Sequence, residues 1–515
     1  MTCNIGKITG RIFGSLMVTL FATVANAEEK INYSVEGIAS IAEGSFAPYY
    51  MASNRHGELT QSKGLQLKAG AFRLWQSDRR FSYGYGAEFI TDYYNTAAYS
   101  RYTYNFNGHD GWDGNPQRPA GIWLQQLYGE VRYRGVFLTA GMKEHQSALL
   151  NFNLSSGDLV ESGNSRPIPE VRVGFNDFQN IPFTDGWVQI QGEISYGKFT
   201  DNGWLKDHFN YYTGHINLGA LYTYKRCYFR TKPSQPLSVT VGMQVGGMFG
   251  GTTQYYTGGR LTAEKKYSKG IKEFFKMFVP TDGGQEYYSG SSLGSWDLHL
   301  RYWLKNGAHI VAYMQKPWED GSGIGFMNGF DGLWGLEYKS AFPGIVNGAV
   351  VEYLDFTNQS GPMHWDPDDA PGSTITTRAE GADDYYNNHE YNSYANYGMA
   401  IGTPFLPSPV YNTDGYLGFA NTRVRGFHAG IEGEPVRGVK YRVLGGYRKG
   451  WGSGYVPTKP THDTSFMAEV KVTPERMESL SMKLQLALDH GDMFGNTFGA
   501  CFGISYKGDL TFGKK

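Results

Sequence analysis

The sequence predicts an all-β protein: a transmembrane antiparallel β-barrel of about 18 strands with long extracellular loops and a short loop helix. Three observations carry this prediction. Apolar and polar residues alternate from one end of the chain to the other, aromatic residues gather where strands should end, and short turns alternate with much longer loops. Aromatic residues make up 16% of the chain and charged residues only 18%, which is unusual for a soluble enzyme of this size.

Period-2 alternation is the signal of a strand with one polar face and one apolar face. In residues 482–489 every even position is apolar, whereas Lys483, Gln485 and Asp489 stand at odd positions. The same pattern recurs in 126–133, 188–194, 237–246 and 297–304.

Alternation alone fits a soluble sandwich or a membrane barrel, but three features favour the barrel. Many strands have the roughly 9–11 residues that cross a bilayer. Tyrosine pairs stand where an interfacial girdle belongs, and tight turns such as Asn306-Gly307 separate neighbouring strands. Such a barrel would have a wide polar interior, either open to water or filled by loops. The tyrosine pairs are Tyr93-Tyr94, Tyr211-Tyr212 and Tyr287-Tyr288.

Residues 1–27 have the pattern of a secretory signal peptide. Lys7 and Arg11 precede an apolar stretch over 12–24, and the segment ends in Ala-Asn-Ala, a cleavage site of small residues. The apolar stretch is too short for a spanning helix of about 20 residues. We therefore expect export through the periplasm and a single outer-membrane barrel domain over 28–515.

Several classes of protein are disfavoured by the sequence. A net charge of −1 lacks the basic excess that would suggest a nucleic-acid-binding protein. Cys227 and Cys501 are the cysteines beyond the signal segment, too few for a disulfide framework, although the two could pair. No catalytic signature, phosphate-binding loop or zinc helix is present, so we expect no enzyme, cofactor or metal. Acidic residues around 366–369 favour a solvated loop over a calcium site.

Three stretches, 95–120, 250–295 and 358–421, predict the long loops, and loops of such length are usually functional. Within 263–279, apolar residues fall on one helical stripe and lysines mostly elsewhere, which predicts an amphipathic helix ended by Pro280. A helix packed in a loop or in the barrel mouth is favoured over one that contacts lipid head groups or an acidic glycan.

Aromatic side chains in the loops suit carbohydrate, because sugar rings have apolar faces that stack on Trp and Tyr. The alternative for each ring is that it braces a loop or belongs to the interfacial girdle. The glycan-binding candidates are Trp112, Trp318, Trp365, Tyr385 and Tyr386.

The most specific segment is 162–169, with the sequence Ser-Gly-Asn-Ser-Arg-Pro-Ile-Pro. Its two prolines force an extended backbone that leads into the strand predicted at 171–173. The segment resembles the signature of the capsule assembly protein Wzi family. The stretches 385–405 and 488–504 are also similar to Bacteroides-like members. The motif residues, whose role is unknown, are Ser162, Gly163, Asn164, Arg166, Pro167 and Pro169.

The resemblance implies an outer-membrane lectin-like protein that attaches or organises capsular polysaccharide at the cell surface, with polysaccharide and outer-membrane lipid as partners. Such proteins are not enzymes, so the resemblance carries over no catalytic residue. Two other functions stay open. A polar lumen also fits a porin or glycan uptake channel, and plentiful carboxylates leave room for a surface glycan hydrolase.

Overall fold

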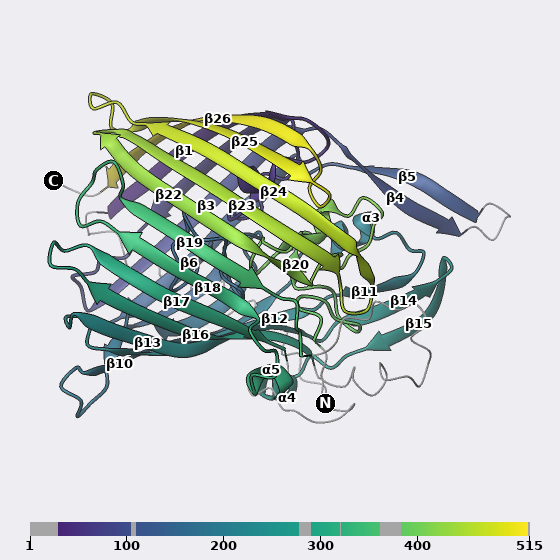
Figure 1. Cartoon of the computed structure of the whole chain (residues 1–515), viewed down its shortest axis with the longest axis horizontal. Helices are drawn as coiled ribbons and strands as arrows, with labels where there is room; N and C mark the ends of the chain where they lie inside the picture. Colours follow the sequence, from purple (N-terminus) through teal and green to yellow (C-terminus); the bar gives the residue numbers. More distant parts are fainter. Residues whose placement is uncertain (1–28, 105–109, 278–289, 320, 361–382, 513–515) are drawn as a thin grey trace.

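The computed structural model describes residues 29–104, 110–277, 290–319, 321–360 and 383–512. The signal segment, Trp365, the acidic residues at 366–369 and the pair Tyr287-Tyr288 lie outside these ranges. The described chain forms a closed antiparallel barrel of 18 strands, as the sequence predicts (Figure 1). The strands are β1 (Glu29–Ala42), β2 (Gly64–Arg73), β3 (Phe81–Tyr94), β6 (Ile122–Tyr133), β7 (Val136–Met142), β8 (Glu170–Phe175), β10 (Val188–Lys198), β12 (Leu221–Thr231), β13 (Leu237–Phe249), β16 (Gly290–Trp303), β17 (His309–Trp318), β18 (Gly332–Lys339), β19 (Gly348–Asp355), β22 (Val424–Val436), β23 (Val439–Gly452), β24 (Pro457–Val472), β25 (Leu480–Gly491) and β26 (Thr497–Phe512).

Closure comes from the first and last strands. Strand β1 pairs with β2 on one side and with β26 on the other, in a register that runs from Glu29 opposite Phe512 to Ala42 opposite Gly499. The short strand β9 (Gln179–Asn180) pairs with β10 beside β8. No sheet edge is left in the barrel wall, which satisfies the requirement that backbone groups in a bilayer bond internally.

The two faces of the wall are those expected of a membrane barrel. On β25 the side chain of Leu484 is 46% exposed, whereas that of its neighbour Gln485 is 3% exposed. On β16, Leu300 and Tyr302 point outward, while Asp297 and His299 are buried. Apolar side chains thus form the outer surface and polar ones face the lumen. The outer surface is therefore suited to contact with the lipid of a bilayer.

The connections differ sharply at the two ends of the barrel. The first and last described residues, Glu29 and Phe512, lie at one end, where turns such as the one at Asn306-Gly307 are short; Gly307 has a φ of +81°. The longest connections lie at the other end. In outer-membrane barrels the short turns face the periplasm and the long loops face the outside, which orients this chain.

The long connections carry elements of their own. Strands β4 (Ala97–Tyr104) and β5 (Asp110–Gln117) form a hairpin that projects from the barrel (Figure 1). A small sheet joins β11 (Gly214–Leu218), β14 (Thr252–Thr257) and β15 (Arg260–Lys266), and β20 (Ala395–Asn396) pairs with β21 (Met399–Ala400). The helices are α2 (Tyr49–Ala52), α3 (Asn202–His208), α4 (Ile271–Lys276), α5 (Gly321–Ile324) and the 3-10 turn η1 (Pro409–Tyr411).

The helix predicted over 263–279 is much shorter than expected. Its first residues belong to β15, which pairs with β14, and the helix itself is α4. Strand pairing therefore overrides the helical pattern at 263–266. Among the described residues, no helix has both the length and the apolar character needed to cross a bilayer. Cys227 and Cys501 are both free.

Candidate functional site

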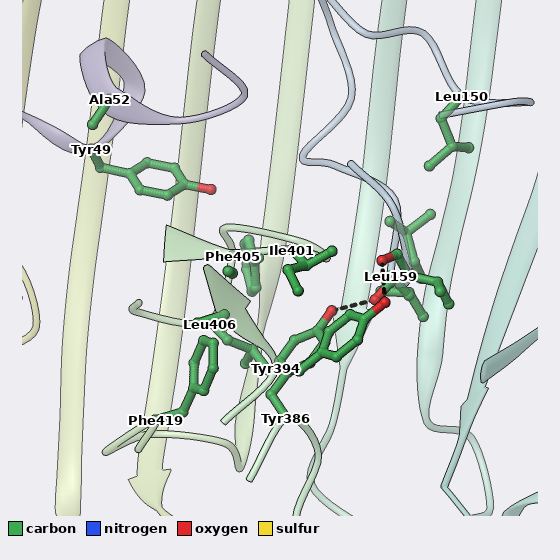
Figure 2. Close-up of a cluster of buried hydrophobic side chains, with 14 of the residues drawn as sticks. Tyr49, Ala52, Leu150, Leu159, Tyr386, Tyr394, Ile401, Phe405, Leu406 and Phe419 are labelled. Carbon is green, nitrogen blue, oxygen red and sulfur yellow. Dashed lines mark hydrogen bonds between the residues drawn. The ribbon is translucent and has the colours of Figure 1, made fainter. Parts of the chain in front are cut away.

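Three connections turn back into the lumen and fill it on the side of the long loops. We name them the first plug segment (43–63), the second (143–169) and the third (383–423). Their side chains pack together as the main buried apolar cluster of the chain, which Figure 2 shows between the barrel strands. Tyr49 comes from the first segment, Leu159 from the second, and Tyr386 and Phe405 from the third.

Polar side chains of the wall hold the second plug segment. The Glu352 carboxylate on β19 accepts a hydrogen bond from Ser155 Oγ at 2.7 Å. Gln315 Oε1 on β17 accepts one from the backbone N–H of Leu159 at 3.0 Å. These lumen-facing polar groups are therefore partnered by the plug, which makes the plug part of the folded core.

Residues of the segment 162–169 join the plug segments to one another. Ser162 Oγ donates to the carbonyl of Gly402 at 2.7 Å, and Asn164 Nδ2 donates to the carbonyl of Ala400 at 3.1 Å. Asn164 Oδ1 also accepts from the backbone N–H of Asn54 in the first plug segment at 3.0 Å. Gly163 has a φ of +79°, and a Cβ there would lie 2.7 Å from the carbonyl oxygen of His145, so only glycine fits.

Arg166 is held between two aromatic rings. Its guanidinium lies 4.1 Å from the ring centroid of Trp123 on β6 and 4.7 Å from that of Tyr397. Burial lowers the pKa of Arg166 to about 10. Pro167 and Pro169 then lead the chain into β8, where the carbonyl of Pro169 accepts from the backbone N–H of Lys198 at 3.1 Å. In this structure the motif holds the plug together and lies away from the outer surface.

A buried ion cluster ties the second plug segment to the wall. Arg172 on β8 contacts Glu161 of the plug at 2.5 Å, Glu170 at 2.7 Å and Glu193 at 2.8 Å. Arg226 contacts the second oxygen of Glu193 at 3.2 Å. Burial opposes ionisation of Glu161, yet the Arg172 guanidinium holds the pKa of that carboxyl below its usual value. The cluster stays charged inside the barrel and fixes the plug at one point.

An exposed group of rings lies at the end of the long loops. We name Tyr102, Trp112 and Tyr212 the aromatic patch. Their ring centroids lie 4.7 Å (Tyr102–Tyr212), 5.1 Å (Trp112–Tyr212) and 5.5 Å (Tyr102–Trp112) apart. The side chain of Trp112 is 52% exposed and that of Tyr212 is 39% exposed. The patch therefore presents ring faces and edges to the outside.

Two loops build the patch, and hydrogen bonds join them to each other. The backbone N–H of Tyr102 on β4 donates to the carbonyl of Asn210 at 2.7 Å, and Asn115 Nδ2 on β5 donates to the carbonyl of Asp207 at 2.6 Å. Two exposed arginines flank the rings: Arg101 lies over the Tyr211 ring and Arg260 over the Tyr104 ring. The surface combines stacking faces with hydrogen-bond donors.

The structure separates the aromatic candidates predicted from the sequence. Trp112 lies in the exposed patch, whereas Trp318 is completely buried at the end of β17. Tyr385 and Tyr386 are buried in the third plug segment, where Tyr386 Oη donates to the carbonyl of Leu159 at 2.6 Å. The rings of Tyr385 and Tyr386 brace the plug, and none of the three buried rings leaves an open face for a sugar. Tyr212, which the sequence assigned to the girdle, stands beside Trp112 instead.

Buried acids make the third plug segment sensitive to pH. Burial raises the pKa of Asp384 to about 6 and that of Asp201, which accepts from the backbone N–H of Tyr397 at 3.3 Å, to about 7. Burial likewise raises the pKa of Glu319, which accepts from the backbone N–H of Asp384 at 3.2 Å. Between about pH 4 and pH 7 the folded segment binds protons that the unfolded chain has lost, so its stability falls as pH rises.

We expect the amides of the third plug segment to lose hydrogen-exchange protection between about pH 4 and pH 7, after correction for the intrinsic exchange rate. Asp384→Asn should flatten this change, because one of the titrating groups is gone. Protection that stays constant or rises with pH would contradict the assignment.

The closed barrel, its apolar outside and its long loops at one end define the class: an outer-membrane β-barrel with a filled lumen. No protein-family model matches the chain, and no curated protein matches its sequence. Among solved structures, it is similar to Wzi, an outer-membrane protein involved in group 1 capsule assembly in Escherichia coli and a carbohydrate-binding β-barrel. That similarity has a TM-score of 0.53 at 12% identity and covers 97% of this chain and 88% of Wzi.

Two further solved barrels also resemble the chain in fold. OccAB2 of Acinetobacter baumannii has a TM-score of 0.46 at 8% identity, covering 94% of this chain and 98% of its own. OccK5 of Pseudomonas aeruginosa has a TM-score of 0.44 at 8% identity, with the same two coverages of 94% and 98%. At these identities the likeness to Wzi establishes the fold alone.

Proposed function

We propose that this protein is a lectin-like member of the Wzi family that attaches or organises capsular polysaccharide at the cell surface. The observation that carries the proposal is the aromatic patch, an exposed cluster of rings flanked by arginines at the outer end of the barrel. Exposed aromatic rings offer faces for sugar C–H groups, and arginine donates hydrogen bonds to hydroxyls or carboxylates.

Binding of this kind needs no chemical step and no cofactor. Each contact between the patch and one sugar unit is weak, but a repeating polymer engages many barrels in one membrane at once. The second and later contacts are intramolecular, so the polymer is held far more tightly than a single unit. This makes non-enzymatic attachment sufficient for retention of a capsule.

The filled lumen supports a binder over the alternative of a porin or uptake channel. The three plug segments pack into one apolar core, and wall residues such as Glu352 and Gln315 bond to the plug. The resemblance of 162–169 to the Wzi signature supports the same proposal, as does the similarity of the fold to the Escherichia coli barrel. We also propose that residues 1–27 direct export and are removed.

Deletion of the gene is expected to lower the share of capsular polysaccharide bound to cells and to raise the share in the medium, with the total unchanged. The measurement is the amount of polysaccharide in washed cells and in the supernatant, and complementation with the wild-type gene should restore the distribution. An unchanged distribution in the deletion strain would refute attachment as the function.

A further inference from the structure

Beneath the plug, the lumen opens into two cavities of about 550 and 420 Å³ that share Lys471 and Lys483 in their walls. The larger one is lined by Asn32 near the start of β1 and by Gly508 near the end of β26. This places it on the periplasmic side. The smaller one is bounded by Tyr50 of the first plug segment and by residues of the second. We call the two together the periplasmic vestibule.

The vestibule is basic. Among the described residues, seven basic and four acidic side chains line it, although the whole chain is close to neutral. The basic residues are Arg55, Lys68, Lys440, Arg442, Lys471, Lys483 and Lys507, and the acidic ones are Glu36, Glu88, Glu432 and Glu469. Positive charge concentrated in a concave, low-dielectric space raises the local concentration of anions.

Three of these lysines form a row across neighbouring strands. Lys440 on β23 stands directly opposite Lys471 on β24, and Lys471 stands directly opposite Lys483 on β25. Strands lie about 4.8 Å apart, so the row is about 10 Å long. Like charges directly opposite each other destabilise a sheet, and nothing in the alternation of polar and apolar residues requires three lysines here.

Among the described residues, only the two lysines at the ends of the row have a carboxylate partner. Lys440 lies 3.7 Å from Glu434, and Lys483 lies 3.7 Å from Glu36. In the described part of the chain, neither the central Lys471 nor Lys507, which lines the same cavity, has a carboxylate within ion-pair distance. Four ammonium groups therefore line the two connected parts of the vestibule, and carboxylates compensate their charge only in part.

We propose that the periplasmic vestibule is a binding site for an oligoanion, a molecule with two or more carboxylate or phosphate groups that ion-pair with Lys440, Lys471 and Lys483. This site lies on the other side of the plug from the aromatic patch, so it does not depend on the proposed surface function. Carboxylates of an acidic oligosaccharide and phosphates of a polyphosphate share the required chemistry.

Calorimetric titration of the full-length protein in a nonionic detergent tests the proposal with three probes: trigalacturonic acid, tripolyphosphate and the neutral maltotriose. We expect at least one of the anions to bind, more weakly at higher salt, and maltotriose not to bind. Lys471→Gln should weaken anion binding by about tenfold or more, the effect of one lost charge-assisted contact. Whichever of the two anions binds more tightly shows whether the natural ligand supplies carboxylates or phosphates.

Lys305→Gln is the matched control, because it removes the same charge at an exposed turn of the same end, outside the vestibule. Without ligand, Lys471→Gln should melt no lower than the wild type, since it relieves repulsion within the row. Failure of both anions to bind, or equal binding by Lys471→Gln and the wild type, would overturn the proposal.

Discussion

Replacing Arg172 with methionine is expected to open the barrel to ions. The guanidinium joins Glu161 of the second plug segment to Glu170 and Glu193 of the wall. Removing one member of a buried ion cluster costs about 3–5 kcal/mol, because the remaining charges are left without compensation. Since Glu161 is held in place by this cluster, we expect the second plug segment to leave its position while the strands stay paired.

The measurement is conductance of the purified protein in a planar bilayer. The wild type should be silent, whereas Arg172→Met should give frequent openings. Arg437→Met is the matched control, because Arg437 is 78% exposed and its contacts with Glu475 and Glu478 are both 3.9 Å long. Unchanged electrophoretic migration of the unheated protein would show that the barrel is folded. A folded Arg172→Met barrel that stays silent would contradict the anchoring role of this cluster.

Removing the aromatic patch is expected to abolish binding of the surface polysaccharide. Trp112 and Tyr212 contribute their exposed rings from two different loops. Loss of each stacking face should cost about 1–2 kcal/mol per contact, and the losses multiply for a polymer that binds many barrels. The double variant Trp112→Ala/Tyr212→Ala should therefore reduce retention of polysaccharide on immobilised protein by far more than tenfold.

The control for the patch is Trp187→Ala. Trp187 is 53% exposed, about as much as Trp112, but it lies at a turn on the opposite end of the barrel. Its replacement should leave binding unchanged. Equal loss of binding in Trp187→Ala and in the double variant would show that the effect is not specific to the patch.

Much of the fold could be predicted because strand alternation is local. On β25 each residue's face follows from its position, so Gln485 and Asp489 line the lumen and Leu484 and Leu488 face outward as expected. The predicted tight turn at Asn306-Gly307 also holds, since Gly307 adopts a left-handed backbone. These features depend on neighbours in the chain and need no knowledge of distant contacts.

The site was harder to predict, because the composition of a loop does not show whether it stays at the surface or folds back into the lumen. Tyr385 and Tyr386 stand in an Asn- and Asp-rich stretch that suits an exposed glycan site, yet the chain returns into the lumen and buries both rings. Trp318 is also buried, at the end of the wall strand β17. Alternation assigns faces only within a strand, so it cannot separate a loop at the surface from a plug.

Other features depend on register between strands that are apart in the sequence. Lys440, Lys471 and Lys483 look like ordinary lumen-facing lysines when each strand is considered alone, and only the pairing of β23 to β25 makes them a row. The aromatic patch likewise needs Tyr212 to meet Trp112 across two loops. A tyrosine pair at a strand end suggested a membrane girdle, and no sequence signal distinguished the two roles.

The most direct test of the account is made in cells that lack the chromosomal gene and carry either the wild type or Trp112→Ala/Tyr212→Ala. The measurement is the share of capsular polysaccharide that stays with washed cells, at equal amounts of barrel in the outer membrane. We predict that the wild type restores cell-bound capsule and that the double variant sheds it into the medium as the deletion does. Full retention by the double variant would contradict attachment through the aromatic patch.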